Sequence, residues 1–269
     1  MSREIFSHPS LARIRWGSSC FHGCGLPLGE AGVLRVPEGT SIVPEEAYLK
    51  RQDIRRVVIP DGVTEIRGYA FFFCKSLEEI NLPETLRVIG DGAFNLCQSL
   101  REISIPDGVT EIGVDAFEDC KSLERVALPG TLREIGPGAF AHCAALREIV
   151  LPEGLSEIRA DAFEGCERLE RAELPRTLTS ISGWAFARCR RLREITVPEG
   201  VTAILHGTFE GCESLETVFL PEGLRSIDRA AFAGCTALKR VELPASFRAL
   251  EKQRKLDRAG IPARIRAYR

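Results

Sequence analysis

Cysteine and histidine are the residue types in this chain that could bind a metal ion or act as a nucleophile. The 269 residues include 10 cysteines and 4 histidines. One local cluster, CFHGC, holds Cys20, His22 and Cys24, with His8 upstream. Its spacing differs from that of zinc knuckles and ribbons, and no second pair of ligands follows it. We therefore expect no metal site and no cofactor.

The sequence lacks the motifs of common enzymes. The four histidines are scattered along the chain at positions 8, 22, 142 and 206. No glycine-rich phosphate loop, GxSxG elbow or HExxH helix occurs. Carboxylates are abundant, but they recur at repeat positions that suit a solvated face. We expect no enzymatic activity and no small-molecule substrate.

A repeat positions most of the cysteines. Ten prolines recur at a fixed interval of 23 residues from Pro37 to Pro244, without a single insertion. A fixed period in this range is typical of a solenoid, in which each unit buries its apolar face only against its neighbours. The chain is therefore expected to form one elongated domain.

The unit Pro83–Ile105 shows the expected local structure. Ile103 and Ile105 alternate as in a half-buried strand, whereas the apolar positions from Leu86 to Leu100 recur at roughly three-residue steps. Each unit thus predicts a short strand and a looser return arc, irregular or briefly helical. The inward positions repeat as columns, of which the phenylalanine column is Phe71, Phe94, Phe117, Phe140, Phe163, Phe186, Phe209 and Phe232.

The pattern LPxxLxxIxxxAFxxCxxLxxIxLP resembles the bacterial leucine-rich repeats of the BspA-like class, named after a surface adhesin. The resemblance covers nine units, residues 37–243. The first unit departs from the pattern, because Tyr48 replaces the phenylalanine and Arg51 replaces the cysteine. The resemblance implies a right-handed solenoid with a parallel β-sheet on its concave side, and a binding role without chemistry.

Eight cysteines form an inward column beside the phenylalanines, from Cys74 to Cys235. Stacked coils lie about 4.8 Å apart, a separation that permits disulfides between neighbouring members. Each cysteine nevertheless lies between a phenylalanine and a leucine, where a small thiol behaves as a modest hydrophobe. We expect these thiols to be reduced and slow to react.

The two ends of the chain depart from the period. Residues 1–36 carry a fair apolar load and are expected to form an N-terminal cap over the outward aromatics Tyr69, Phe72 and Phe73. Residues 244–269 predict a basic capping helix, with Ser246 as its N-cap and a stop signal at Gly260. Residues 245–269 hold eight basic and two acidic residues, a net +6; residues 37–244 hold 24 and 34, a net −10.

The N-terminal sequence, MSREIFSHPSLARIRW, has no apolar core of a signal peptide, and no run is long enough to span a membrane. We expect a cytoplasmic protein, or a cell-surface or secreted one if the true N-terminus is missing or export is non-standard.

The outward strand positions separate a repeating column from variable ones. One column alternates in sign without exception, from Arg55 and Glu78 to Glu216 and Lys239, so it is interpreted as structural. Thr and Gly also alternate from Gly62 to Gly200, which suggests growth by duplication of unit pairs. Two further outward columns do not repeat and are free to carry recognition. Their partner-binding candidates are Arg125, Val150, Arg171, Thr196, Thr217 and Phe219.

These columns predict a monomeric scaffold that binds a protein partner through its concave face. Nine coils give a sheet about 43 Å long, enough for a standard interface. Phe219 is expected to be the one large aromatic exposed there, and aromatics with arginine are the usual anchors. Two alternatives stay open. The chain could be a structural spacer or adhesin-type module without a dedicated site, or the basic C-terminal helix could bind an anionic surface or nucleic acid.

Overall fold

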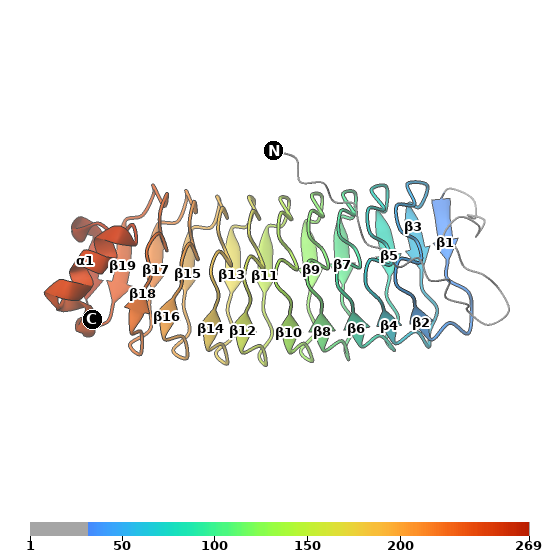
Figure 1. Cartoon of the computed structure of the whole chain (residues 1–269), viewed down its shortest axis with the longest axis horizontal. Helices are drawn as coiled ribbons and strands as arrows, with labels where there is room; N and C mark the ends of the chain where they lie inside the picture. The colour runs from blue at the N-terminus through green and yellow to red at the C-terminus, as the bar shows by residue number, and fades with distance from the viewer. Residues whose placement is uncertain (1–31, 269) are drawn as a thin grey trace, which may run out of the picture.

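The computed structural model describes residues 32–268, apart from the side chains of residues 250–253. These residues form one stack of coils that runs from β1 at one end to α1 at the other (Figure 1). The expected metal-ligand cluster around Cys20 and the first 31 residues of the expected N-terminal cap lie outside the described residues. The leucine-rich-repeat solenoid that the repeat pattern predicts is confirmed.

Each coil contributes one strand to what we call the major row. Its strands are β1 (Val33–Arg35), β3 (Arg56–Val58), β5 (Glu79–Asn81), β7 (Glu102–Ser104), β9 (Arg125–Ala127), β11 (Glu148–Val150), β13 (Arg171–Glu173), β15 (Glu194–Thr196), β17 (Thr217–Phe219) and β19 (Arg240–Leu243). Paired strands are parallel, and each residue faces the residue 23 positions later, as Glu148 faces Arg171. The middle residue points inward because successive side chains alternate across a strand.

A second row of strands lies on the return arc, which the sequence analysis expected to be irregular or briefly helical. The strands of this minor row are β2 (Ile42–Val43), β4 (Glu65–Ile66), β6 (Val88–Ile89), β8 (Glu111–Ile112), β10 (Glu134–Ile135), β12 (Glu157–Ile158), β14 (Ser180–Ile181), β16 (Ala203–Ile204) and β18 (Ser226–Ile227). Turns, not helices, join the two rows in these coils. The isoleucine column of the arc therefore sits on strands, where its branched side chains pack well.

The major row is not continuous. Its strands pair in four separate groups: β1-β3-β5, β7-β9, β11-β13 and β15-β17-β19 with one further strand. Three breaks therefore separate β5 from β7, β9 from β11, and β13 from β15, and the same grouping is visible in Figure 1. At each break the minor row is paired, as β4-β6, β8-β10 and β12-β14. Adjacent coils thus keep at least one row of strand pairing.

Threonine hydroxyls tie together the turns that directly follow paired major strands, such as β7 and β9. The hydroxyl of Thr131 accepts a hydrogen bond from the Gly108 N–H (3.0 Å) and donates one to the Val109 carbonyl (2.9 Å). Thr85 and Thr177 make the equivalent bonds after the paired strands β3-β5 and β11-β13. The alternation of Thr and Gly in the sequence is therefore a two-coil structural unit, with one tie per pair of coils.

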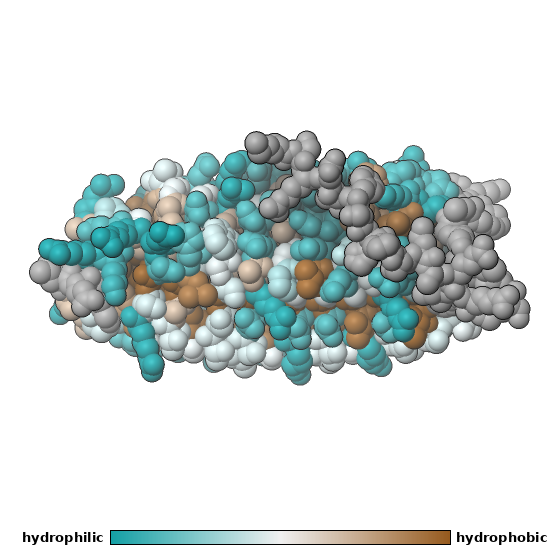
Figure 2. Space-filling model, viewed as in Figure 1, coloured by the Kyte–Doolittle hydropathy of each residue, from teal (hydrophilic) through white to brown (hydrophobic). Residues whose placement is uncertain are grey.

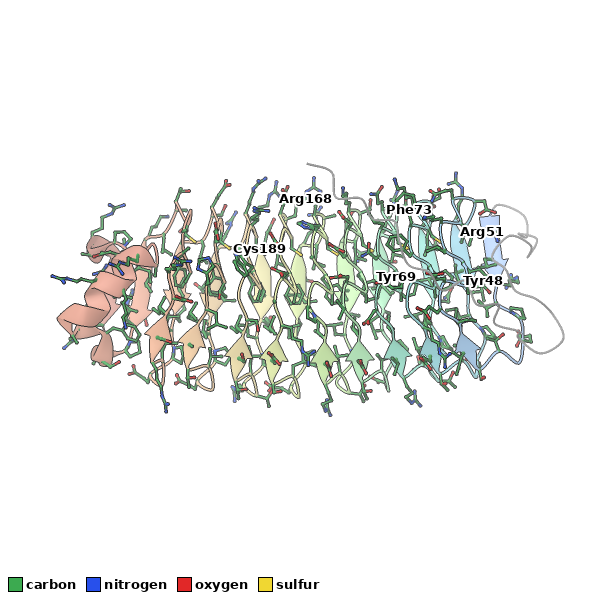
Figure 3. The ribbon with its side chains drawn as sticks, in the orientation of Figure 1. Tyr48, Arg51, Tyr69, Phe73, Arg168 and Cys189 are labelled. Atoms are coloured by element: carbon green, nitrogen blue, oxygen red, sulfur yellow. The ribbon has the colours of Figure 1, made fainter. Side chains whose placement is uncertain are left out.

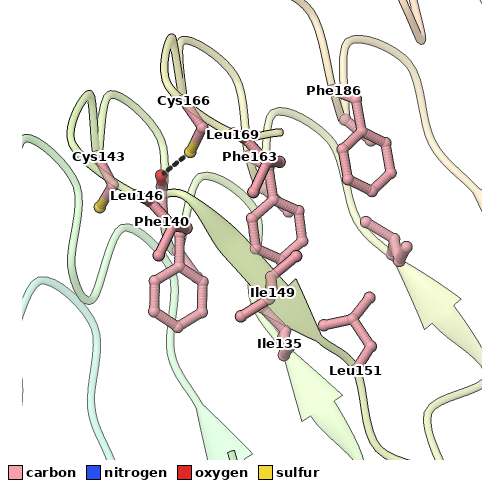
Figure 4. Packing of buried hydrophobic residues seen from close by; sticks show 14 of the residues in the cluster. Ile135, Phe140, Cys143, Leu146, Ile149, Leu151, Phe163, Cys166, Leu169 and Phe186 are labelled. Atoms are coloured by element: carbon pink, nitrogen blue, oxygen red, sulfur yellow. Dashed lines mark hydrogen bonds between the residues drawn. The ribbon is translucent and has the colours of Figure 1, made fainter. Parts of the chain in front are cut away.

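The core is a set of ladders along the stack. Tyr48 and the eight column phenylalanines stack face to face, with ring centroids 5.1–5.8 Å apart. All eight phenylalanines are buried, and the isoleucine and leucine columns pack beside them (Figure 4). Because every coil presents the same side chain at the same place, burial of one unit depends on both of its neighbours.

The eight column cysteines are free thiols in the structure. Each thiol donates to the backbone carbonyl of the aromatic residue 26 positions earlier, at 3.1–3.3 Å. Burial raises the pKa of every one of them, to about 12 for Cys74, Cys166 and Cys235. The column is therefore held in the protonated form that can donate these bonds.

The turns of each coil require two residues in the left-handed region. Nine coils each have two residues with φ between 52° and 76°, and several of them are not glycine. Trp184, with φ 56°, is one of the bulky exceptions, and its ring covers Gly207 of the next coil. A Cβ on Gly207 would lie 2.5 Å from the indole nitrogen. A bulky residue at this position thus depends on a glycine one coil later.

The C-terminal end combines the expected capping helix with a strand. The 3-10 helix η2 (Ala245–Arg248) precedes α1 (Leu250–Arg258), and η3 (Ala263–Ile265) leads into β20 (Arg266–Tyr268). The N-cap residue of α1 is Ala249, so the expectation of Ser246 is wrong, because η2 occupies that segment. β20 pairs in parallel with β19 and extends the major row, which the sequence analysis did not predict.

Two bonds join α1 to the last coil. The N–H groups of Ala230 and Phe232 donate to the carbonyls of Arg258 and Ala259, at 3.0 and 2.8 Å. The last carbonyls of a helix lack partners within the helix. The open end of the solenoid and the end of the helix therefore satisfy each other.

Candidate binding surface on the major strands

The first and third residues of the major strands point away from the core and form a surface that we call the strand face. On β9, β11 and β13 both of these residues are exposed. The middle residues, such as Ile149, lie beneath them in the core. Folding therefore places few demands on the identity of the outward residues, as the sequence analysis predicted from their lack of repetition.

Ion pairs orient two of the candidate arginines. Arg125 contacts Glu102 of the preceding strand at 2.6 Å, and Arg171 contacts Glu173 of its own strand at 2.6 Å. The hydrogen bond from Arg125 to Glu102 raises the pKa of the arginine. Exposed pairs of this kind contribute little to folding. Their effect is to hold the guanidinium groups in defined positions on the strand face.

Val150 is the most exposed large aliphatic side chain of the described residues, with 55% of its surface accessible. It lies at the end of β11, where its register partner on β13 is Glu173. Thr196 is exposed at the equivalent position of β15. The centre of the strand face therefore presents one apolar side chain among charged and hydroxyl groups.

Phe219 differs from its prediction. Its side chain is half-buried rather than exposed, as is that of Thr217 on the same strand. Phe219 lies between Thr196 on β15 and Glu242 on β19 in the paired sheet. The paired strands on both sides explain the partial burial, which a single column of sequence could not reveal. Phe219 remains a candidate, with less accessible surface than expected.

The breaks in the major row divide the candidates. Arg125 on β9 and Val150 on β11 lie on opposite sides of one break. Arg171 on β13 and Thr196 on β15 lie on opposite sides of the next. The candidates thus occupy consecutive strands, as predicted, but two of the three steps between their four strands cross an unpaired gap.

The alternating charge column forms ion pairs near its two ends. Arg55 contacts Glu78 at 2.8 Å, and Lys239 contacts Glu216 at 2.7 Å. Glu170, farther along the column, contacts Arg191 at 3.7 Å. The structural interpretation of the column therefore applies to these members, whereas Arg101, Arg147 and Arg193 are exposed and form no salt bridge in the described part of the chain.

Large exposed apolar side chains also occur on the turns between the two rows. Tyr69 is 42% exposed and meets Phe72 edge to face at 5.7 Å, and Lys75 lies 4.2 Å from the Phe73 ring (Figure 3). Trp184, also 42% exposed, meets His206 edge to face at 5.1 Å. Sequence reasoning identified the first group and missed the second. The available signal was a tryptophan in a column otherwise rich in glycine and aspartate.

Figure 2 shows hydrophobic areas interspersed with hydrophilic side chains along the visible face of the stack. Among residues 32–268, no three histidine, cysteine, aspartate or glutamate side chains cluster as metal ligands would. The same range contains no helix with the length and apolar character needed to cross a membrane. The strand face therefore presents scattered charged, hydroxyl and apolar groups.

Comparison with known proteins supports the fold. A family model described as a BspA type leucine rich repeat region matches residues 40–170 and 133–254, with six copies. A search of curated proteins finds no match.

Several solved bacterial structures are similar. The leucine rich repeat protein of T. pallidum is 36% identical over 61% of this chain and 79% of its own, with a TM-score of 0.58. A leucine-rich repeat protein from Bacteroides ovatus is 23% identical over 88% of this chain and 92% of its own, with a TM-score of 0.47. A leucine rich cell surface protein from Faecalibacterium prausnitzii is 24% identical over 88% and 78%, with a TM-score of 0.43.

Proposed function

Because this chain belongs to the BspA-type leucine-rich repeat family, whose repeats generally serve interaction or adhesion, we propose that it binds a protein partner through the strand face. The residues that carry the binding are Arg125, Val150, Arg171, Thr196, Thr217 and Phe219. The solenoid supplies a rigid support, since the side chains beneath these residues are locked in the core.

The observation that carries the proposal is the exposure of Val150 between oriented charges. A valine with 55% of its surface accessible gains from burial by a partner. Arg125 and Arg171, on the strands to either side, are already held by their carboxylates. Binding therefore loses less side-chain entropy than it would with free arginines. An apolar contact inside a polar surround is the usual arrangement of an interface.

Affinity capture with matched variants tests the proposal. The intact chain, a Val150→Glu/Arg171→Glu variant and an Arg168→Glu control are immobilised in parallel, and captured proteins are then purified and titrated singly. Arg168 is exposed and lies away from the strand face (Figure 3). A true partner binds the intact chain and the Arg168→Glu control equally well, and its binding to the double variant is lost.

Single truncations give the magnitude. Arg171→Ala or Val150→Ala should each weaken the binding of a purified partner by about 1–2 kcal/mol, as for interface anchors. Both variants should unfold at the parent midpoint, since both side chains are exposed. If every purified partner binds the double variant as tightly as the intact chain, the strand face is not the binding surface.

A further inference from the structure

The three breaks in the major row expose part of the core. The inner residues that precede each break are partly exposed, namely Ile80, Leu82, Val126, Leu128, Ala172 and Leu174. Their counterparts on the following strands are buried, as Ile149 (1%) and Ile195 (1%) show. Each break therefore opens a short apolar strip on the strand face, once every two coils.

The backbone beside each break also lacks the partners of a paired sheet. Within the pairs, bonds such as Leu151 N–H to Glu173 carbonyl (3.0 Å) continue the ladder. Strands β9 and β11 do not share a ladder, and neither do β13 and β15. Across the first of these two breaks the Arg147 N–H still reaches the Glu124 carbonyl, at 3.4 Å. Strand N–H and C=O groups beside the breaks that are not bonded within the chain are available to solvent or to a ligand.

Three arginines mark the same two-coil period. Arg101, Arg147 and Arg193 each precede the first strand after a break, and all three are exposed. Among the described residues none of the three is in an ion pair, in contrast to Arg55 and Lys239 of the same column. Arg193 also interacts electrostatically with Glu216, at longer range than a salt bridge. A row of exposed arginines outside salt bridges thus runs beside the row of apolar strips.

We propose that the strand face binds an acidic polyproline-II peptide that lies along the stack and places an apolar residue in successive breaks and a carboxylate beside successive arginines. This inference rests on the proposed function and specifies the chemistry of the partner segment. Two coils span about 9.6 Å, and three residues of polyproline II span about 9.3 Å. The mismatch is about 0.3 Å per step, so three successive sites stay in register.

Other backbone conformations fit less well. Side chains on one face of an extended strand recur at about 6.8 Å and 13.6 Å, on either side of the two-coil spacing. Seven residues of α-helix span about 10.5 Å, but a helix uses its backbone groups internally. The backbone of polyproline II is fully solvated. It can therefore supply the hydrogen bonds that the unpaired strand edges require.

Fluorescence anisotropy with synthetic peptides tests the proposal on the intact chain. The probe is a labelled (Leu-Glu-Pro)5 peptide, which combines the three-residue period with one carboxylate per turn. We expect saturable binding, at least tenfold tighter than that of a scrambled peptide of identical composition. The (Leu-Lys-Pro)5 and (Ser-Glu-Pro)5 peptides should also bind at least tenfold more weakly than the probe. The first reverses the charge, and the second removes the apolar groups.

Matched arginine variants locate the site. The Arg101→Ala/Arg147→Ala/Arg193→Ala variant should bind the (Leu-Glu-Pro)5 peptide at least tenfold more weakly than the parent does. A control variant loses three exposed arginines that lie off the strand face, Arg168, Arg176 and Arg225, and should bind within twofold of the parent. Equal losses in both variants would show that only net charge matters and would overturn the proposal.

The remaining outcomes separate the two levels of inference. If the scrambled peptide, or a helical peptide with acidic and apolar residues at seven-residue spacing, binds as well as the probe, the three-residue period is wrong. If the probe does not bind while purified partners still depend on Val150 and Arg171, this inference fails and the proposed function stands. If purified partners bind the Val150→Glu/Arg171→Glu variant as tightly as the intact chain, the proposed function fails independently of the peptide result.

Discussion

The thiol of Cys166 donates a hydrogen bond to the backbone carbonyl of Phe140, one coil earlier, at 3.2 Å (Figure 4). The same oxygen accepts the N–H of Cys143 at 3.3 Å, so both of its lone pairs are used. The site is fully buried. Cysteine is suited to it because it is small and apolar and still carries a donor, which alanine and valine lack.

Replacement of Cys166 by alanine tests this relationship. The Phe140 carbonyl would keep one partner and lose the other, and a small void would replace the sulfur. We expect a loss of about 1–2 kcal/mol in the free energy of unfolding, measured by urea denaturation. Cys235 lies at the end of the column and is 9% exposed, so Cys235→Ala is the matched control and should lower the free energy of unfolding by less. Equal stability of Cys166→Ala and the parent would show that the thiol bond contributes nothing.

The raised pKa values predict alkaline destabilisation. Unfolded thiols ionise near pH 8.5, whereas the folded column stays protonated to about pH 12 at Cys74, Cys166 and Cys235. Above pH 8.5 the folded state therefore binds more protons than the unfolded state. Stability is complete below that pH and falls as pH rises, by about 1.4 kcal/mol per pH unit for each thiol.

Urea denaturation at pH 7.5, 8.5 and 9.5 measures this dependence. Eight such thiols give a limiting slope of about 11 kcal/mol per pH unit. Replacing four of them by alanine should roughly halve the slope, whatever its effect at pH 7.5. Native column thiols should resist alkylation throughout and react fully in urea. A flat stability profile between pH 8.5 and 9.5 would contradict the prediction.

Removal of one ring from the phenylalanine ladder should be costly. Phe140 stacks on Phe117 at 5.2 Å and on Phe163 at 5.6 Å, and it is fully buried. Phe140→Ala leaves a cavity between two rings that the coil spacing holds apart. We expect a loss of about 3–5 kcal/mol by urea or thermal denaturation. Phe140→Leu should lose less, and a loss below 1 kcal/mol for the alanine variant would argue against the ladder.

The threonine ties can be tested by removing one hydroxyl. Thr131→Val keeps the shape of the side chain and loses both bonds, to the Gly108 N–H and the Val109 carbonyl. We expect a loss of about 1–2 kcal/mol and faster hydrogen exchange of the Gly108 amide. Thr131→Ser keeps the hydroxyl and should retain the protection of that amide. Unchanged exchange in Thr131→Val would mean that the tie has no effect on the turn.

Gly260 controls how α1 meets the last coil. Its φ is 92°, and a Cβ there would lie 2.6 Å from the Phe232 carbonyl oxygen. Gly260→Ala should therefore lower the stability by more than about 1 kcal/mol and accelerate exchange of the Ala230 and Phe232 amides. Gly223→Ala is the control, because the nearest atom to its Cβ would be 3.5 Å away. Equal effects of the two variants would contradict this role of Gly260.

The 23-residue period alone determined the solenoid, its columns and the inward place of Phe140 and Cys166. Identical residues at a fixed interval fall at the same place on successive coils, so stacking one coil on the next aligns them without further information. The outward and variable character of Arg125, Val150 and Arg171 followed from the same regularity.

Tertiary structure alone decided how neighbouring coils touch. The bond from Cys166 to Phe140 and the separation of β9 from β11 depend on shifts between coils that are small beside the repeat itself. The partial burial of Phe219 follows from the strands on both sides of it, and the pairing of β20 with β19 follows from the path of the chain beyond the last repeat. A sequence period specifies which residues share a column, but distances of a few ångströms between columns arise from packing of the whole stack.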